Sequence, residues 1–226
     1  MAEDIRVAVS ETANSLLKGK SHIKLLEAGC GSATHVKFAS AVYAVGIDIS
    51  KEQLDRNSVV QEKILGDIQI YPLPKEEYDV AVCWMVLEHL SRPKDALSNL
   101  FDAVKPNGLL IVAIPNLLSF KGLVTKFTPY WFHKLFYRIM KYKSRPFPTY
   151  LRLAILPKNV VQLAKDHDFS LAYLKLEEGD QLIRVKRRFW FMSWLFSGAD
   201  SAMRVISLGR LPSLTLDNCF MILKKA

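Results

Sequence analysis

Three carboxylates, each at the end of a short apolar segment, are the first residues of this sequence that could do chemistry. Glu27 precedes the turn formed by Gly29 and Gly31, Asp48 stands 19 residues after Gly29, and Asp67 closes a third segment. Glycines let a backbone turn sharply and approach a ligand closely, and a carboxylate placed like Asp48 can accept hydrogen bonds from both hydroxyls of a ribose. Asp67 could accept a hydrogen bond from an adenine amino group. Each acid alone is also typical of the solvated end of a strand, but the three together predict a nucleoside-containing cofactor.

Two such cofactors fit the pattern, a nicotinamide dinucleotide and S-adenosylmethionine (SAM). Thr34 replaces the third glycine of the dinucleotide-binding fingerprint. Glu27, directly before the glycine turn, would crowd a pyrophosphate but suits the cationic amino end of SAM. The sequence therefore favours SAM.

Methyl transfer from a sulfonium is an in-line displacement, and an oxygen acceptor gains from a general base. The candidate bases are His89 and Glu88, just after a predicted strand, and His133, in a segment expected to cover the site. His89 could equally cap and pack its segment, and His133 could be a surface residue. No Cys/His cluster has zinc spacing and no acidic group suggests magnesium, so we expect no metal.

The elements that must position these residues alternate between strands and helices. This alternation predicts an α/β fold, a doubly wound Rossmann-like sheet, in one domain over residues 1–226. Helical inserts are expected at 117–156, after the fifth strand, and at 181–213, after the sixth. Strands are predicted at 23–28, 42–47, 63–65, 78–84, 109–114, 169–176 and 214–223, and helices at 3–18, 34–40, 51–56, 93–104 and 157–168.

The positive charge is concentrated in the predicted inserts. The net charge is +9, yet residues 103–165 contain eleven basic residues and no Asp or Glu. From Thr128 onward, a helical wheel places Trp131 and Leu135 on an apolar half opposite a basic half, a pattern typical of interfacial helices. Residues 187–196 add a second basic and aromatic segment. The apolar halves could instead pack on the sheet or line an acceptor pocket.

These features predict an amphiphilic or anionic small-molecule acceptor and peripheral contact with an anionic membrane. Nucleic acid is disfavoured because the aromatic residues cluster instead of following a groove. Residues 119–145 and 181–213 are expected to form a basic, apolar-rimmed cap over the acceptor side. The start of the chain does not resemble a secretory signal and no long apolar run is present, so we expect a cytoplasmic protein, with or without membrane association.

Five ordered segments resemble the motifs of class I SAM-dependent methyltransferases of the type 11/12 kind, including ubiquinone-biosynthesis O-methyltransferases. The segments are Leu26-Glu27-Ala28-Gly29-Cys30-Gly31, Gly46-Ile47-Asp48-Ile49-Ser50, Gly66-Asp67-Ile68, Tyr78-Asp79-Val80 with Val86-Leu87-Glu88-His89-Leu90, and Lys105-Pro106-Asn107-Gly108-Leu109-Leu110. The segments 129–133 and 145–150 are also similar to methyltransferases of polysaccharide or secondary-metabolite loci.

The resemblance implies a seven-stranded sheet with an antiparallel last strand, and it implies where SAM is held. It places Glu27, Gly29 and Gly31 around the methionine part and Asp48 with Ile49 at the ribose and adenine. It also implies contacts of Asp67 and Ile68 with the adenine, and it places Trp84 beside the cofactor.

We therefore expect SAM-dependent methylation, most simply O-methylation, of a small-molecule, lipid-like or glycan acceptor. Two alternatives remain at this point. One is a catalytically silent SAM-fold protein that acts as a membrane-docked partner, and the other is an RNA methyltransferase.

Overall fold

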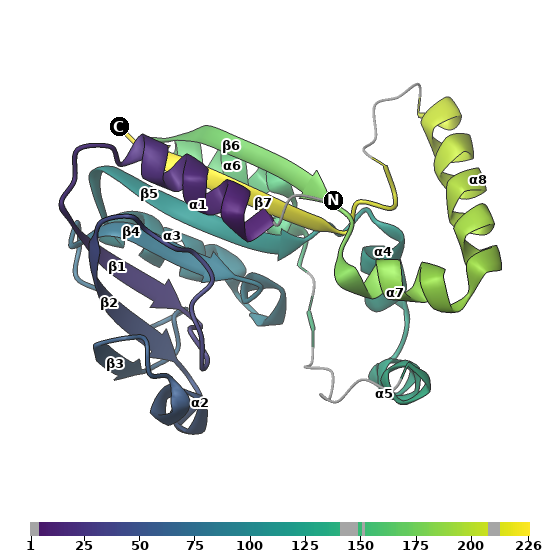
Figure 1. Cartoon of the computed structure of the whole chain (residues 1–226), viewed down its shortest axis with the longest axis horizontal. Coiled ribbons are helices and arrows are strands. Elements are labelled where there is room, and N and C mark those ends of the chain that lie inside the picture. The colour runs from purple at the N-terminus through teal and green to yellow at the C-terminus, as the bar shows by residue number, and fades with distance from the viewer. Residues whose placement is uncertain (1–4, 141–148, 151, 208–212) are drawn as a thin grey trace.

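The computed structural model describes residues 5–140, 149–150, 152–207 and 213–226, without the side chains of 190–192, 204 and 206. Helices cover a central sheet, and a separate group of helices extends from one end of it (Figure 1). Among the described helices, none combines the length and apolar character that crossing a membrane requires.

Seven strands form one sheet in the order β3-β2-β1-β4-β5-β7-β6. The strands are β1 (His22–Ala28), β2 (Ala41–Asp48), β3 (Glu62–Leu65), β4 (Tyr78–Trp84), β5 (Val104–Pro115), β6 (Phe169–Glu177) and β7 (Asn218–Lys225). The first five strands are parallel, and β7 lies antiparallel between β5 and β6. This confirms the predicted doubly wound sheet. Because the strand order reverses between β1 and β4, the crevice at their carboxyl ends is where such a sheet binds a ligand.

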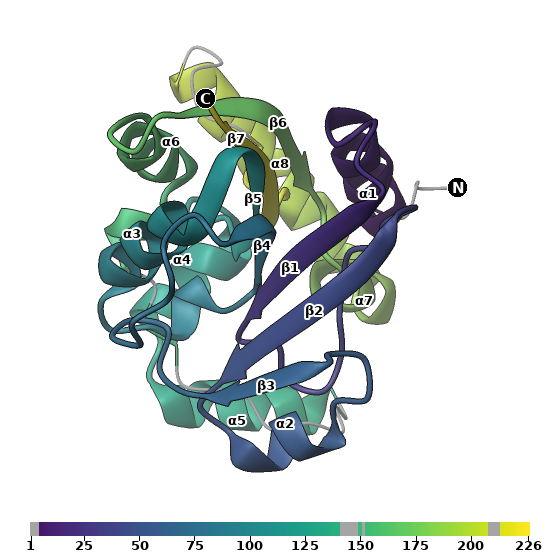
Figure 2. The same ribbon diagram turned by 90° about the vertical axis from the view of Figure 1, so that its left-hand side faces the viewer.

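Helices pack on both faces of the sheet. Figure 2 shows α1 (Ile5–Leu16) on one face and α3 (Pro93–Ala103) and α6 (Pro157–Lys165) on the other. The short helix α2 (Lys51–Arg56) follows β2, and two 3-10 turns, η1 (Leu87–His89) and η2 (Leu153–Ile155), follow β4 and precede α6.

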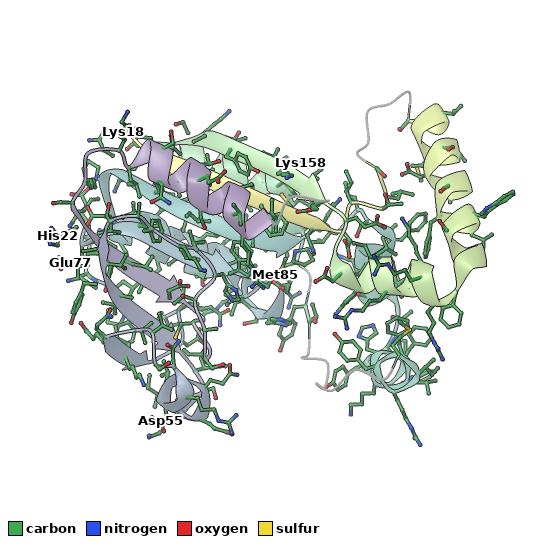
Figure 3. All side chains as sticks on the ribbon, viewed as in Figure 1. Lys18, His22, Asp55, Glu77, Met85 and Lys158 are labelled. Carbon is green, nitrogen blue, oxygen red and sulfur yellow. The ribbon has the colours of Figure 1, made fainter. Side chains whose placement is uncertain are left out.

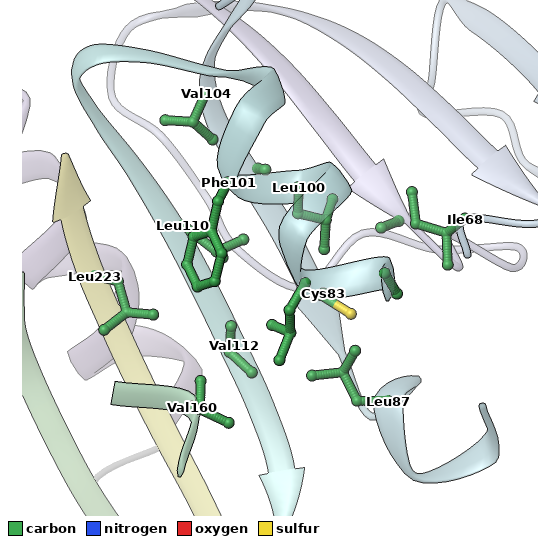
Figure 4. Packing of buried hydrophobic residues seen from close by; sticks show 14 of the residues in the cluster. Ile68, Cys83, Leu87, Leu100, Phe101, Val104, Leu110, Val112, Val160 and Leu223 are labelled. Atoms are coloured by element: carbon green, nitrogen blue, oxygen red, sulfur yellow. The ribbon is translucent and has the colours of Figure 1, made fainter. Parts of the chain in front are cut away.

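Alternate residues of the central strands build two separate cores. Leu110 and Val112 of β5 pack with Phe101 of α3 (Figure 4), whereas Leu109 and Ile111 belong to the cluster beneath α1. A strand whose side chains are buried on both faces must be apolar almost throughout, as β5 is. This packing fixes the carboxyl ends of β1, β4 and β5, from which the candidate site residues extend.

The helix predicted over residues 34–40 is wrong, because this segment has no helical turn in the structure. Its backbone is held by side chains of α1 instead. The Lys37 N–H donates to Ser10 Oγ at 3.0 Å, the Ala39 N–H donates to Asn14 Oδ1 at 2.8 Å, and Asn14 Nδ2 donates to the Lys37 carbonyl at 3.1 Å. These tertiary hydrogen bonds satisfy backbone groups that a helix would have satisfied internally.

The two inserts emerge at the carboxyl end of the sheet and contact each other. The first contains α4 (Phe120–Phe127) and α5 (Tyr130–Ile139), and the second contains α7 (Asp180–Arg188) and α8 (Trp190–Ile206) (Figure 1). The Phe120 ring lies 5.0 Å from the Phe196 ring, and Gln181 Nε2 donates to Tyr137 Oη at 3.1 Å. Most of the segment 145–150, which resembles methyltransferases of polysaccharide loci, lies outside the described residues, and the cap over an acceptor remains a prediction.

Candidate active site

The turn after β4 marks the end of the sheet that carries the candidate site. Met85 adopts a positive φ of 54°, a conformation that costs a non-glycine residue energy and is concentrated at functional sites. In Figure 3, Met85 lies at the opposite end of the sheet from His22 and Glu77 and faces the inserts. The residues predicted to hold the cofactor lie at or just after the carboxyl ends of β1, β2, β3 and β4.

The glycine turn after β1 takes a left-handed backbone at both of its glycines. Gly29 has φ +65° and Gly31 has φ +50°. A Cβ atom on Gly29 would come within 2.4 Å of a Val86 methyl group, so the turn lies directly against the segment after β4. The N–H groups of Gly29 and Cys30 donate to the Ile47 carbonyl at 2.8 and 3.2 Å. The turn therefore packs between β2 and the segment after β4 that carries Glu88.

Asp48 holds the glycine turn in place. Its Oδ2 accepts the Gly31 N–H at 2.8 Å and its Oδ1 accepts the Ser50 N–H at 2.8 Å. Ser50 in turn caps α2 by accepting the Gln53 N–H. A carboxylate oxygen can accept more than one hydrogen bond, so Asp48 retains the capacity to bind the hydroxyls of a ribose.

Glu27 is a buried carboxyl with an unused hydrogen-bond capacity. Its side chain lies at the carboxyl end of β1, the residue is 1% exposed, and Oε1 has no hydrogen-bond partner among the described residues. Burial raises the pKa of Glu27 to about 8, and the backbone N–H of His35 partly opposes this shift. A cation placed against Oε1 would compensate the buried charge, so the residue fits the ammonium group at the amino-acid end of SAM.

The remaining predicted contacts of the nucleoside lie after β2 and β3. Ile49 is 75% exposed, an apolar side chain beside Asp48 that a bound ring would cover. Asp67 is half-buried and accepts the Gln69 N–H at 2.9 Å and the Gln69 side-chain amide at 2.9 Å and 3.0 Å. Ile68 is buried in the core. Asp67 is thus fixed by its own loop, and the Ile68 side chain supports the loop from below.

Trp84, at the end of β4, packs against His35, which lies in the segment 34–40 that was predicted to be a helix. The half-buried Trp84 ring stacks on the His35 ring at 5.3 Å and lies 5.2 Å from the Phe220 ring. Nδ1 of His35 is buried without a hydrogen-bond partner among the described residues, and burial lowers the pKa of His35, with Arg6 adding to the effect. Because the backbone N–H of His35 also interacts with Glu27, this stack adjoins the buried carboxyl.

Glu88 and His89 form a carboxyl–imidazole pair on the turn η1. Glu88 is buried, its Oε2 has no hydrogen-bond partner among the described residues, and its Oε1 lies 3.9 Å from Nε2 of the half-exposed His89. Burial raises the pKa of Glu88 to about 7, and the Lys121 ammonium opposes this shift. A carboxyl with a pKa near neutrality can gain and lose a proton under ordinary conditions, as a general base must.

Lys121 and Asp217 attach the first insert to the sheet. Lys121 Nζ of α4 lies 3.6 Å from Oδ2 of Asp217, a fully buried carboxyl whose Oδ1 accepts the Gly179 N–H. Burial raises the pKa of Asp217, and Lys121 opposes this shift. Sequence reasoning missed both residues, because Asp217 falls inside the strand predicted over 214–223, whereas the observed β7 begins one residue after it.

His133, the second predicted base, lies on α5. Its Nε2 lies 2.7 Å from Thr128 Oγ1, and partial burial lowers the pKa of the ring. The His133 side chain thus contacts Thr128, which lies in the turn between α4 and α5. The structure thus gathers Glu27, Gly29, Asp48, Glu88 and their neighbours at one edge, with His133 in the insert.

Residues 1–147 match the family model of a methyltransferase domain. The chain is 33% identical over 102 residues to a mitochondrial ubiquinone biosynthesis O-methyltransferase of Schizosaccharomyces pombe, with 40% of this chain and 37% of that protein covered. It is 32% identical over 110 residues to a tRNA (carboxymethyluridine(34)-5-O)-methyltransferase of Arabidopsis thaliana, with 46% and 27% covered. The matched region spans less than half the length of both relatives.

Solved structures share the fold over nearly the whole chain. A SAM-dependent methyltransferase from Archaeoglobus fulgidus superposes with a TM-score of 0.54 at 16% identity, covering 97% of this chain and 94% of that one. One from Mesorhizobium loti gives a TM-score of 0.55 at 13% identity, covering 95% and 96%. At these identities the likeness concerns the fold.

Proposed function

Because this chain belongs to the family of class I SAM-dependent methyltransferase domains, we propose that it transfers the methyl group of SAM to an oxygen atom of a small acceptor. The proposed acceptor is amphiphilic or anionic, of a lipid-like or glycan type. The observation that carries the proposal is the buried Glu88 carboxyl beside His89, on the segment that packs against the glycine turn.

The residues at the carboxyl ends of the strands fit SAM as its binding site. Glu27 would hold the ammonium group, the two glycines would let the backbone approach the methionine part, and Asp48 would accept hydrogen bonds from the ribose hydroxyls. When bound, SAM supplies an electrophilic methyl group. The orphaned oxygen of Glu27 supports this assignment, because an unpaired buried carboxylate is costly and a ligand cation would compensate it.

Methylation of a hydroxyl requires that the hydroxyl lose its proton, and Glu88 is the proposed acceptor of that proton. Its Oε2 has no hydrogen-bond partner among the described residues and can accept the proton of a substrate hydroxyl, while the half-exposed His89 lies 3.9 Å from its Oε1. Two residues before Glu88, Val86 packs on Gly29, so the base and the glycine turn belong to one packed unit. The pKa of about 7 predicts that activity rises as the pH passes neutrality and Glu88 ionises.

The relatives support an oxygen acceptor without fixing its identity. Two matched proteins are named as O-methyltransferases, one of ubiquinone biosynthesis and one of a carboxymethyluridine in tRNA. The basic and apolar inserts of this chain favour the lipid-like or anionic small molecule over RNA.

The test is incubation of the full chain with methyl-labelled SAM and separate lipid, aqueous-metabolite and RNA fractions of a cell extract. We expect label in the lipid or metabolite fraction, and a loss of about 10²–10⁴-fold in Glu88→Gln, typical of removing a general base. A matched control is Glu52→Gln on exposed α2, which should keep full activity.

Each other result overturns the proposal. Label in RNA alone would assign an RNA methyltransferase. SAM binding without transfer to any fraction would assign a catalytically silent protein. Full activity in Glu88→Gln would remove the base from the mechanism.

A further inference from the structure

The exposed surface of α4 and α5 consists of an apolar stripe beside a basic stripe. On α5, Trp131, Leu135 and Ile139 recur at steps of four residues, so they line one ridge of the helix, and they are 64%, 46% and 52% exposed. Although amphipathic, α5 has no buried residue among those described. Its outer apolar ridge is therefore left in contact with solvent.

The neighbouring ridge of the same helix carries positive charge. Tyr130, Lys134 and Arg138 also recur at steps of four, and Lys134 Nζ lies 4.6 Å from the centre of the Tyr130 ring. At the end of α4, Phe127 is 76% exposed beside the exposed Lys126. We call the surface formed by Lys126, Phe127 and these two ridges the α5 face.

We infer that the α5 face docks on an anionic membrane surface, with its apolar ridge in the headgroup boundary and its basic ridge against the lipid phosphates. The charge argument is that every exposed charged residue described on this face is basic and that residues 103–165 contain no Asp or Glu. An apolar stripe flanked by Lys and Arg, with a Trp, is the composition that binds at the interface of anionic bilayers. The proposal concerns docking alone and goes beyond the proposed methyl transfer.

Two other occupants fit this face less well. In a two-fold pair of this chain, the basic ridge would face its own copy and repel it. A single nucleic acid strand would be bound by aromatic rings interleaved with cations along a groove, whereas here the apolar residues form a continuous ridge. The face also adjoins the candidate site, since α4 follows β5 directly and Lys121 of α4 pairs with Asp217. Docking would thus bring the acceptor side of the sheet close to the bilayer.

Vesicle flotation with the full chain and no cofactor tests the docking. We expect binding to phosphatidylglycerol vesicles that falls with added salt, and little binding to phosphatidylcholine vesicles. Lys134→Gln with Arg138→Gln should weaken the partition by about 30-fold, from about fivefold per charge removed near an anionic surface. Trp131→Ser with Leu135→Ser should also release the protein, since it removes two of the three side chains of the apolar ridge without changing charge.

Two matched control variants distinguish an effect of the α5 face from a general loss of positive charge or of exposed apolar side chains. Lys51→Gln with Arg56→Gln removes two exposed charges from α2, and Leu171→Ser with Leu174→Ser removes two exposed apolar side chains from the edge strand β6. Both controls should float like the parent, and circular dichroism should show that every variant is folded.

The docking proposal is overturned if the parent does not float with phosphatidylglycerol, or if the α2 control loses binding as much as the α5 charge variant. It is also overturned if the chain binds single-stranded RNA through these residues while ignoring both kinds of vesicle. None of these outcomes depends on whether methyl transfer occurs, so the docking and the proposed function can fail separately.

Discussion

Replacement of Gly29 by alanine should be the most costly single methyl addition to the glycine turn. The backbone is left-handed there, with φ +65°, and the new Cβ atom would lie 2.4 Å from one methyl group of Val86 and 2.9 Å from the other. The left-handed conformation costs a non-glycine residue about 1–2 kcal/mol. Forcing a methyl group into a packed contact adds about 1–3 kcal/mol, so we expect a total of about 2–5 kcal/mol in the free energy of unfolding.

The chain offers two glycines that separate these contributions. Gly19 has φ +96° with no atom within 4 Å of its Cβ position, so Gly19→Ala should show the backbone cost alone, about 1–2 kcal/mol. Gly198 lies in α8 with open space around it, and Gly198→Ala should be neutral or stabilise the protein by up to about 1 kcal/mol. Urea denaturation followed by circular dichroism gives all three free energies.

A second substitution tests the contact itself. Val86→Ala in the Gly29→Ala background should recover part of the lost stability, because it removes both methyl groups that the new Cβ meets. If Gly29→Ala is no more destabilising than Gly19→Ala, or if Val86→Ala recovers nothing, then the close packing of the glycine turn on the β4 segment is refuted.

Two further predictions concern the buried carboxyls. The pKa of Glu27 is raised to about 8 in the folded state, above its ordinary value of 4.5, so folding takes up a proton between these values and stability should fall as the pH rises through this window. Over the whole window this fall amounts to about 5 kcal/mol, and thermal melts should show that Glu27→Gln lacks it. Equal pH profiles for variant and parent would contradict the assignment. Asp217→Ala should cost about 1–3 kcal/mol in urea because the buried Gly179 N–H loses its acceptor, whereas Asp217→Asn keeps an acceptor and should cost less. Equal costs for the two variants would show that the hydrogen bond does not matter.

The sheet could be predicted from the sequence because burial on both faces leaves a local signal. β4 and β5 are apolar runs of strand length bounded by turn residues, and their predicted bounds fall inside the observed strands. Asp48 could be placed for the same reason, since the polar residue that ends a buried strand is visible in the sequence.

The errors and omissions arose where a distant residue decides the local structure. Residues 34–40 have the composition of a short helix, but Ser10 and Asn14 of α1 hold their backbone in an irregular, non-helical path. The contact between Lys121 and Asp217 joins residues nearly a hundred positions apart, and no spacing rule connects them. The altered pKa of Glu88 likewise follows from burial by the whole fold and has no local signal.

Calorimetry with S-adenosylhomocysteine, which keeps the amino-acid end of SAM, tests most directly whether Glu27 holds the ammonium group of the cofactor. At neutral pH the free Glu27 carboxyl is largely protonated, so binding a cation should ionise it and release about one proton, measured by repeating the titration in buffers of different ionisation enthalpy. Glu27→Gln should bind about 10–100-fold more weakly and release no proton, as expected for loss of a charged hydrogen bond. Binding of equal strength with the same proton release in Glu27→Gln, or tight binding of NADH with none of S-adenosylhomocysteine, would contradict the account.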